Sequence, residues 1–359
     1  MKQKHCLFFL GHPAHFHMFK NTIAELNQQG VRTTLMVKTK DVLTDLLEAS
    51  GLEYCNTLPR GRKDGIWGII EGLIVKTSVL YRFAKQTKPD LMLGTSAEIA
   101  WVGKLLGIKS LVFNEDDYYV VKGFARVVYP FASAIVSPAI CDNGPWQRKT
   151  ITYQGYQKLA YLHPKRFVPN VEMVQKYFDA SKPYSIIRFA KLNAHHDTFA
   201  EGFTAEIAAE TIKRLQKYGA VYITSERPLE SQFERYRLNI NPLDIHHVLA
   251  FTQLYLGDSQ SMAVEAAILG TPSLRFSSFA GKISVLEELE SKYQLTFGIH
   301  PSRPEELYRK IEDVFATDDR KNLFAANRAK MLNEKEDVTS FYLKTIHNFI
   351  GIERNDARG

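Results

Sequence analysis

The segment from Gly257 to Arg275 constrains the fold more than any other part of this chain. It follows a short apolar run, Leu254–Leu256, that predicts a buried strand. Gly257 ends that strand, and Met262–Leu269 predicts an apolar helix that stops at Gly270. Another short strand, Ser273–Phe276, comes next. The segment therefore predicts a strand–loop–helix–strand unit of an α/β sheet.

The loop of this unit has the features of an anion site. Open α/β sheets bind ligands at the carboxyl ends of their strands, and a helix N-terminus attracts phosphate through its amides and dipole. We assign four polar residues to this site: Asp258, Ser259, Gln260 and Ser261. Glu265 is the only charged residue on the helix, where its carboxylate could accept both hydroxyls of a ribose. The alternative is a glutamate at the surface or partly paired within the protein.

Length and composition indicate a globular protein with two domains. The chain has 359 residues, of which 45% are hydrophobic and 24% charged. Its three cysteines are far apart and form no CxxC pair, which favours a reducing compartment over a disulfide scaffold. The apolar N-terminal stretch ends at Gly11 without a cleavage site, and no run of 18 apolar residues follows. We therefore expect a cytoplasmic, soluble protein.

The net charge limits the classes of molecule that the protein could bind. The net charge is +7 and the pI is about 9.0, but no basic run is dense enough for a nucleic-acid footprint. Phosphorylated small molecules or an anionic membrane are the better candidates. The basic residues 60–63 precede the apolar stretch Ile66–Ile70, which could touch an anionic membrane at the inner face of the cell membrane. The alternative is a core-facing helix with a solvated basic lead-in.

Strand and helix signals alternate twice along the chain, with a turn-rich stretch at residues 142–182 between the two series. This alternation predicts two doubly wound α/β domains that face a cleft. The expected boundaries are an N-terminal domain at 1–168, a linker at 169–182, a C-terminal domain at 183–335 and a helix at 336–359 that packs back on the first domain.

Histidines cluster where the first predicted strand passes into the first predicted helix. His12, His15 and His17 lie within six residues, and imidazole can act as a general acid or base near neutral pH. We select His15 as the catalytic candidate, His12 as a contact to an acceptor, and His17 as a structural residue inside the helix. A metal pair of the kind found in barrel amidohydrolases is a weaker alternative, because a single barrel would not restart as a second domain.

Other polar residues follow further strands of the first domain. Glu115 and Asp116 come directly after the strand Ser110–Phe113, where adjacent carboxylates could provide a base or hold a divalent ion. An acidic loop that caps the next helix is the alternative. Thr95 and Ser96 follow the strand Leu91–Leu93 and are candidates for acceptor contacts or for a plain helix cap.

The second domain offers further candidates for a bound diphosphate. Arg188, Asn193 and His195 lie at or after its first strand, and a guanidinium can grip phosphate in a fork geometry. Ser225 and Arg227 follow the next strand and are candidates for the same role. The alternative for these residues is a solvated loop.

Four segments together resemble the domain of unknown function 354 family: Gly11–Phe19, Asn114–Asp117, Gly155–Pro164 and Gly257–Pro272. The resemblance covers nearly the whole chain, and the first and third segments are specific to that family. The family is regarded as GT-B-like and distantly similar to UDP-GlcNAc 2-epimerases and the lipid II N-acetylglucosaminyltransferase. The resemblance implies two Rossmann-like domains in the GT-B arrangement.

The resemblance also implies roles for individual residues. Glu265 would hold the ribose of a nucleotide-sugar, and Ser259, Gln260 and Ser261 would hold its diphosphate. His15 matches a loop histidine of the lipid II enzyme, and Glu115 falls near a glutamate of the epimerases. The chain departs from both relatives, with Pro13–Ala14 in place of the lipid II enzyme's glycines and Phe113–Asp117 in place of the epimerase pattern Val-Glu-Ala-Gly-Leu-Arg.

We therefore expect a metal-independent glycosyltransferase that uses a nucleotide-sugar as its substrate and needs no cofactor. The acceptor would be a polysaccharide or glycolipid of the cell surface. Two alternatives remain: a UDP-sugar 2-epimerase-type enzyme of the same fold, and a catalytically silent sugar-nucleotide-binding protein.

Overall fold

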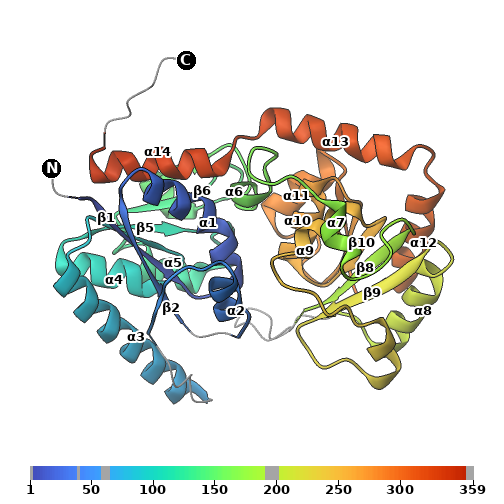
Figure 1. Cartoon of the computed structure of the whole chain (residues 1–359), viewed down its shortest axis with the longest axis horizontal. Coiled ribbons are helices and arrows are strands. Elements are labelled where there is room, and N and C mark those ends of the chain that lie inside the picture. The colour runs from blue at the N-terminus through green and yellow to red at the C-terminus, as the bar shows by residue number, and fades with distance from the viewer. Residues whose placement is uncertain (1–2, 39–40, 58–64, 191–201, 353–359) are drawn as a thin grey trace. The chain divides into compact units, whose positions relative to one another are not determined.

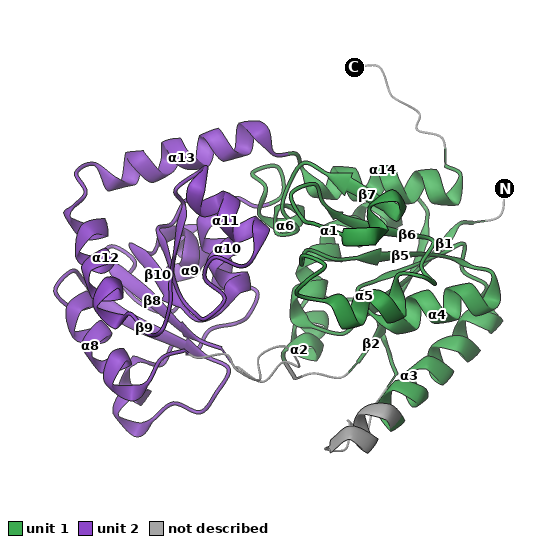
Figure 2. Cartoon of the chain, turned by 180° about the vertical axis from the view of Figure 1, so that it is seen from behind, with its two compact units in different colours: residues 1–166, 336–359 green, residues 167–335 purple. Residues whose placement is uncertain are grey.

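A computed structural model of the protein describes residues 3–38, 41–57, 65–190 and 202–352. The chain forms two compact units, coloured separately in Figure 2. Unit 1 comprises residues 1–166 and 336–359, and unit 2 comprises residues 167–335. The chain therefore leaves unit 1, builds the whole of unit 2 and then returns to unit 1.

Unit 1 alternates strands and helices along the chain (Figure 1). Its elements are β1 (His5–Leu10), α1 (Pro13–Gln28), β2 (Arg32–Val37), α2 (Asp41–Ala49), β3 (Cys55–Asn56), α3 (Gly65–Thr87), β4 (Leu91–Gly94), α4 (Ala97–Leu106), β5 (Lys109–Phe113), α5 (Lys122–Val128), β6 (Ala134–Pro138), the 3-10 helix η1 (Gly144–Lys149), β7 (Thr150–Tyr153), α6 (Leu159–Leu162) and α14 (Val338–Ile350). In the described part of unit 1, the strands pair in parallel in the order β3-β2-β1-β4-β5-β6-β7. This is the Rossmann order with one further strand at the edge.

Alternating side chains of the unit 1 sheet bury its two faces under different helices. Leu7 and Phe9 of β1 pack in one cluster with residues of α3 and α4. Phe8, between them, turns to the other face, where its ring lies edge-on to Phe19 of α1 with the ring centroids 5.2 Å apart. The sheet of unit 1 is therefore buried on both faces, as parallel sheets are.

The returning helix α14 is part of the unit 1 core. The ring of Tyr342 lies edge-on to Phe113 of β5, with the centroids 4.8 Å apart. Asp337, at the start of the returning segment, forms an ion pair with Arg166 at 2.6 Å. Arg166 also pairs with Glu25 of α1. Residues 336–350 are therefore held to unit 1 by aromatic packing and by ion pairs.

Unit 2 contains a smaller sheet. Its elements are α7 (Val171–Gln175), β8 (Tyr184–Phe189), α8 (Ala205–Leu215), β9 (Ala220–Ser225), the 3-10 helix η2 (Ser231–Tyr236), α9 (Ile245–Phe251), β10 (Leu254–Gly257), α10 (Gln260–Leu269), β11 (Ser273–Phe276), α11 (Ser284–Ser291), β12 (Thr296–Ile299), α12 (Pro304–Ala316) and α13 (Arg320–Glu334). Within the described residues, its parallel strands run in the order β12-β11-β10-β8-β9. This is the flavodoxin-like order of doubly wound sheets.

The two faces of the unit 2 sheet differ in character. One face carries Leu254, Leu256 and Phe276 into an apolar core that includes residues of α8 and α12. The opposite face meets α10, where the Ser273 hydroxyl donates to the carbonyl of Ala263 at 3.1 Å. Polar residues of the strands are therefore gathered on the α10 face.

The structure confirms the expected fold class, because both units are parallel α/β sheets with alternating helices. Residues 142–166, within the expected N-terminal domain, belong to unit 1 and supply η1, β7 and α6. Residues 169–182, expected as a linker, belong to unit 2 and include α7. Strand β7 has four residues and lies at the sheet edge, and its flanking turn residues conceal so short a strand in the sequence.

Candidate functional site

Each sheet has a point where the strand order reverses, and doubly wound folds bind ligands beyond the carboxyl ends of the strands at that point. In unit 2 the reversal lies between β8 and β10, and in unit 1 it lies between β1 and β4. Arg188 is near the end of β8 and Asp258 follows β10. In unit 1, His15 follows β1 and Thr95 follows β4. The sequence candidates thus fall at both switch points.

The start of α10 is built as predicted. Ser259 is the N-cap, and its hydroxyl accepts a hydrogen bond from the Met262 amide at 3.4 Å. Gly270 ends the helix in the left-handed conformation, with φ of 84°. Gly257 is required by close approach, because a Cβ there would lie 2.7 Å from the Tyr255 hydroxyl and 2.8 Å from the Arg188 carbonyl oxygen. The loop between β10 and α10 is therefore tightly shaped.

Arg188 lies beside this loop. It is the register partner of Gly257 on β8, so its side chain lies on the same face of the sheet as α10. Its guanidinium pairs with Glu226, whose side chain is 46% exposed, so solvent screens the pair. Its buried Nε finds no hydrogen-bond partner among the described residues. Arg188 therefore lies on the α10 face of the sheet and keeps one donor that the described residues do not satisfy.

Asp258 is buried next to Arg188. One of its carboxylate oxygens accepts a hydrogen bond from the Ala190 amide at 2.6 Å, and its other oxygen has no partner within the described ranges. Burial raises the pKa of Asp258 to about 6, against the lowering effect of the Ala190 amide and of Arg227 and Arg188. Both polar atoms of the Gln260 amide are likewise buried without a partner in the part of the chain described. Buried polar atoms are normally satisfied, so these atoms mark the edge as a candidate site.

Glu265 lies deeper along α10, and its side chain is 10% exposed. One carboxylate oxygen is 3.4 Å from Nε2 of His246, which is on α9. The charge of Glu265, together with those of Arg188 and Asp258, acts on the buried hydroxyl of Tyr255. Glu265 thus belongs to the same electrostatic cluster as the residues at the start of α10. Ser261, one residue past Gln260, is exposed.

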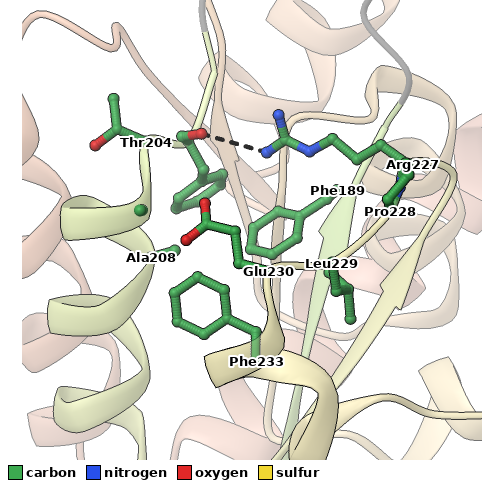
Figure 3. Close-up of a pocket in the computed structure, with 10 residues that line it drawn as sticks. Phe189, Thr204, Ala208, Arg227, Pro228, Leu229, Glu230 and Phe233 are labelled. Carbon is green, nitrogen blue, oxygen red and sulfur yellow. Dashed lines mark hydrogen bonds between the residues drawn. The ribbon is translucent and has the colours of Figure 1, made fainter.

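Ser225 and Arg227 shape a neighbouring turn. The Ser225 hydroxyl donates to the Arg227 carbonyl at 2.6 Å and accepts from the Arg227 amide at 3.1 Å. The Arg227 guanidinium lies 5.0 Å above the Phe189 ring and donates to the Phe203 carbonyl at 3.2 Å, the dashed bond in Figure 3. Arg227, Phe189 and Phe203 form part of the wall of a cavity of about 120 Å³. Phe233 and Glu230 line the same cavity in Figure 3. Two further candidates for the donor site, Asn193 and His195, lie outside the described residues.

In unit 1 the structure brings His15 and Thr95 together. The Thr95 hydroxyl is 2.9 Å from Nε2 of His15, and the Gly11 amide donates to Nδ1 at 3.1 Å. Since Nδ1 accepts from the backbone, the neutral ring carries its proton on Nε2. His12 is the N-cap of α1, and its Nδ1 accepts from the Ala14 amide at 3.2 Å. Ser96 is the N-cap of α4 but makes no side-chain cap hydrogen bond.

Glu115, the first carboxylate after β5, is engaged by a segment distant along the chain. Glu115 forms an ion pair with Lys158 and accepts a hydrogen bond from the Gln157 amide at 2.6 Å. The side chains of Glu115 and Lys158 are 12% and 8% exposed. The Asp116 carbonyl accepts from the Asn114 side chain at 2.5 Å, and the Asp116 side chain is partly buried. Both oxygens of Glu115 are therefore engaged by residues of the segment before α6.

Several residues of these sites had no role in the sequence interpretation. Lys158 lies within the family-specific segment Gly155–Pro164, but only the ion pair shows that it neutralises Glu115. His246 gave no signal, because nothing in the sequence places α9 against α10. Arg275 did give a sequence signal, because it is a single charged residue within the apolar strand β11. Its side chain is 1% exposed. Its guanidinium donates to Glu290 at 2.6 Å.

The described residues contain no group of three or more histidine, cysteine, aspartate or glutamate side chains placed to hold a metal ion. Among the helices of the described chain, none combines the length and the apolar character needed to cross a membrane.

Comparison with solved structures identifies the fold. A UDP-N-acetylglucosamine 2-epimerase, described as putative, from Listeria monocytogenes superposes with a TM-score of 0.70 and 13% identity, over 100% of both chains. The UDP-GlcNAc 2-epimerase from Neisseria meningitidis, solved bound to UDP-GlcNAc, gives a TM-score of 0.69 at 13% identity over 96% of this chain and 100% of that one. A spinosyn forosaminyltransferase gives 0.64 at 13% identity over 98% and 100%. The chain therefore has the GT-B fold, which confirms the distant similarity inferred from its motifs.

No family model and no curated protein matches the chain.

Proposed function

We propose that the protein is a glycosyltransferase of the GT-B fold, which transfers a sugar from a nucleotide-sugar donor to a polysaccharide or glycolipid acceptor of the cell surface. One observation carries the proposal: at the switch point of unit 2, a capped helix N-terminus, a buried arginine donor and a carboxylate on the same helix lie together. These groups match the diphosphate and the ribose of such a donor. The structural similarity to an epimerase solved with UDP-GlcNAc supports this ligand class.

The diphosphate is assigned to the start of α10. There the amides of Gln260 and Ser261 have no partner within the first helical turn, so they and the helix dipole can bind an anion. Arg188 adds a positive charge on the same face of the sheet. These groups would stabilise the diphosphate as it leaves the sugar, which is the role that a metal ion plays in other transferases. Asp258, Ser259, Asn193, His195, Ser225 and Arg227 complete the proposed donor site.

The ribose is assigned to Glu265. It lies five residues beyond Gln260, which is about 7.5 Å along the helix axis. An ionised carboxylate offers only acceptors, which suits the two hydroxyls of a ribose. Because the side chain is 10% exposed, a ligand at the surface of α10 can still reach it.

The acceptor is assigned to unit 1, with His15 as the group that takes the proton from the acceptor hydroxyl. In the structure Nδ1 of His15 is occupied by the Gly11 amide, so His15 must give up that hydrogen bond before it can receive the proton there. Asp116 ranks ahead of Glu115 as a second base, because Lys158 already neutralises Glu115. His12, Thr95 and Ser96 are the proposed contacts to the acceptor.

We also propose peripheral contact with an anionic membrane at the inner face of the cell membrane. The basic segment 60–63 and the side chains of Ile66–Ile70 lie outside the described residues. Further along α3, Ile74 and Val75 are 59% and 39% exposed. An Ile74→Asp variant should sediment less with vesicles that contain anionic lipid, and vesicles of neutral lipid serve as the control.

The function is tested by incubating the protein with UDP-, GDP-, CMP- and dTDP-sugars, first without acceptor. Slow hydrolysis of one donor supports a transferase. Incorporation of solvent deuterium into the sugar would instead show the epimerase reaction. Binding without either outcome, also in the presence of membrane glycolipid extracts, would indicate a silent binding protein. Undiminished nucleotide binding by a Glu265→Ala variant would contradict the ribose assignment.

A further inference from the structure

His246 lies against the carboxylate of Glu265. Its Nε2 is 3.4 Å from a carboxylate oxygen of Glu265, and the two side chains are 3% and 10% exposed. Because His246 is almost fully buried, it has little surface to offer a ligand. His246 can therefore affect a ligand indirectly, through its contact with Glu265.

The helix that carries His246 is held firmly in unit 2. The ring of Phe167 packs against both His246 and His247, with centroid separations of 6.1 and 4.7 Å. Nδ1 of His247 accepts a hydrogen bond from the Asn170 amide at 3.0 Å. The hydroxyl of Tyr177 donates to Asp244, the residue before α9, at 2.7 Å.

A second attachment joins α9 to the far end of α10. The hydroxyl of Thr271, just beyond α10, donates to the carbonyl of Leu249 on α9 at 2.6 Å. The position of His246 relative to Glu265 is therefore set by the packing of two helices and does not depend on surface side chains.

We propose that His246 is a positioning residue, which orients the Glu265 carboxylate so that it accepts the two hydroxyls of a ribose. This inference rests on the proposed function, in which Glu265 contacts the ribose. A glutamate side chain has three rotatable bonds, and a ligand that must order them loses affinity. An imidazole that already contacts one carboxylate oxygen restricts these rotations before the ligand arrives.

The experiment measures binding to the intact chain by calorimetry. The ligands are the tightest binder among UDP, GDP and CMP, and the 2′,3′-dideoxy analogue of that nucleotide. The variants are His246→Leu, His246→Gln and Glu265→Gln, with His247→Leu as a control that disturbs the anchoring of α9 but not the contact with Glu265. Thermal unfolding of each variant verifies that it is folded.

We expect His246→Leu to weaken binding of the nucleotide roughly tenfold, as expected for one lost polar interaction, and to change binding of the dideoxy analogue less than twofold. His246→Gln places an amide donor near the position of Nε2 and should restore most of the affinity. His247→Leu should leave the ratio of the two affinities unchanged.

Equal weakening of both ligands by His246→Leu would show a general structural role and overturn the inference, as would an unchanged affinity for the nucleotide. Should His246→Leu fail to fold, His246→Ala takes its place, and equal weakening of both ligands, or an unchanged affinity for the nucleotide, would overturn the inference. The proposed function fails separately: then no nucleotide binds, or Glu265→Gln binds as tightly as the original protein.

Discussion

Polar side chains at the carboxyl ends of the strands are partnered differently in the two units. In unit 1, Glu115 is paired with Lys158 and a backbone amide, and His15 contacts Gly11 and Thr95. In unit 2, Arg188, Asp258 and Gln260 each keep a buried polar atom without a partner among the described residues. A buried polar atom without a partner costs about 1–3 kcal/mol. The contrast teaches that Glu115 and His15 of unit 1 are engaged within their own unit, whereas these three residues of unit 2 keep polar atoms that the described residues do not satisfy.

The largest expected effect comes from breaking the satisfied pair of unit 1. Lys158→Met leaves the charge of Glu115 in a nearly buried place and should lower the free energy of unfolding by about 3 kcal/mol. Adding Glu115→Gln should recover more than half of that loss, because no charge is then left unpaired. Calorimetry measures both changes, and hydrogen exchange should locate the loss in unit 1. A loss below 1 kcal/mol for Lys158→Met would contradict the contrast.

The next effect tests the ligand side of the contrast. Arg188→Met should weaken binding of the preferred nucleoside diphosphate by about 2 kcal/mol, roughly 30-fold, because it removes a charged donor to phosphate. The free energy of unfolding of this variant should hardly change, because Glu226, the partner of Arg188, is half exposed. Arg235→Met, at an exposed site, is the control and should bind normally. Equal binding by the two variants would remove Arg188 from the donor site.

Asp258 allows a test by pH. Because its pKa in the folded protein, about 6, lies above the unfolded value, the folded state holds the extra proton. The contribution of Asp258 to stability is therefore present below pH 4 and is lost as the pH rises through 6. When the pH rises from 4.5 to 7.5, the free energy of unfolding of the original protein should fall by about 2 kcal/mol relative to that of the Asp258→Asn variant. Urea unfolding at the two pH values measures this, and parallel curves for the two proteins would contradict the raised pKa.

The smallest expected effect is on stability and comes from comparing two helix caps. Ser259→Ala removes a cap that accepts from the Met262 amide and should cost about 1 kcal/mol of stability. Ser96→Ala, at the matching position of unit 1, removes a hydroxyl that makes no cap hydrogen bond and has no partner in the described chain. It should be neutral or slightly stabilising. Similar losses at both sites, measured by thermal unfolding, would show that the two helix starts do not differ.

The sequence was sufficient to predict the features that depend on local residue patterns. The strand, cap, helix and stop of Gly257–Phe276 follow from residue types at fixed offsets, and the structure matches them. Alternation of strands and helices was enough for the fold class. The placement of His15 shortly after the first strand, in the first turn of α1, also followed from local order.

What the sequence could not show are the contacts between residues distant along the chain. Lys158 reaches Glu115 across 43 positions, and His246 meets Glu265 from a different helix. The strand β7 also escaped, because an edge strand of four residues has no distinct periodicity. Tertiary packing decides all three, and it has no local signal.

The division of the chain has a consequence for the order in which the protein is made. Unit 2 is one continuous segment, residues 167–335, whereas unit 1 needs α14, whose residues are synthesised after all of unit 2. On the ribosome, the sheet of unit 1 emerges first but must wait for Tyr342 and Asp337 to close its exposed face. The domain that begins synthesis first is thus the last to be completed, and a chain stalled before residue 336 would carry a finished unit 2 and an open unit 1.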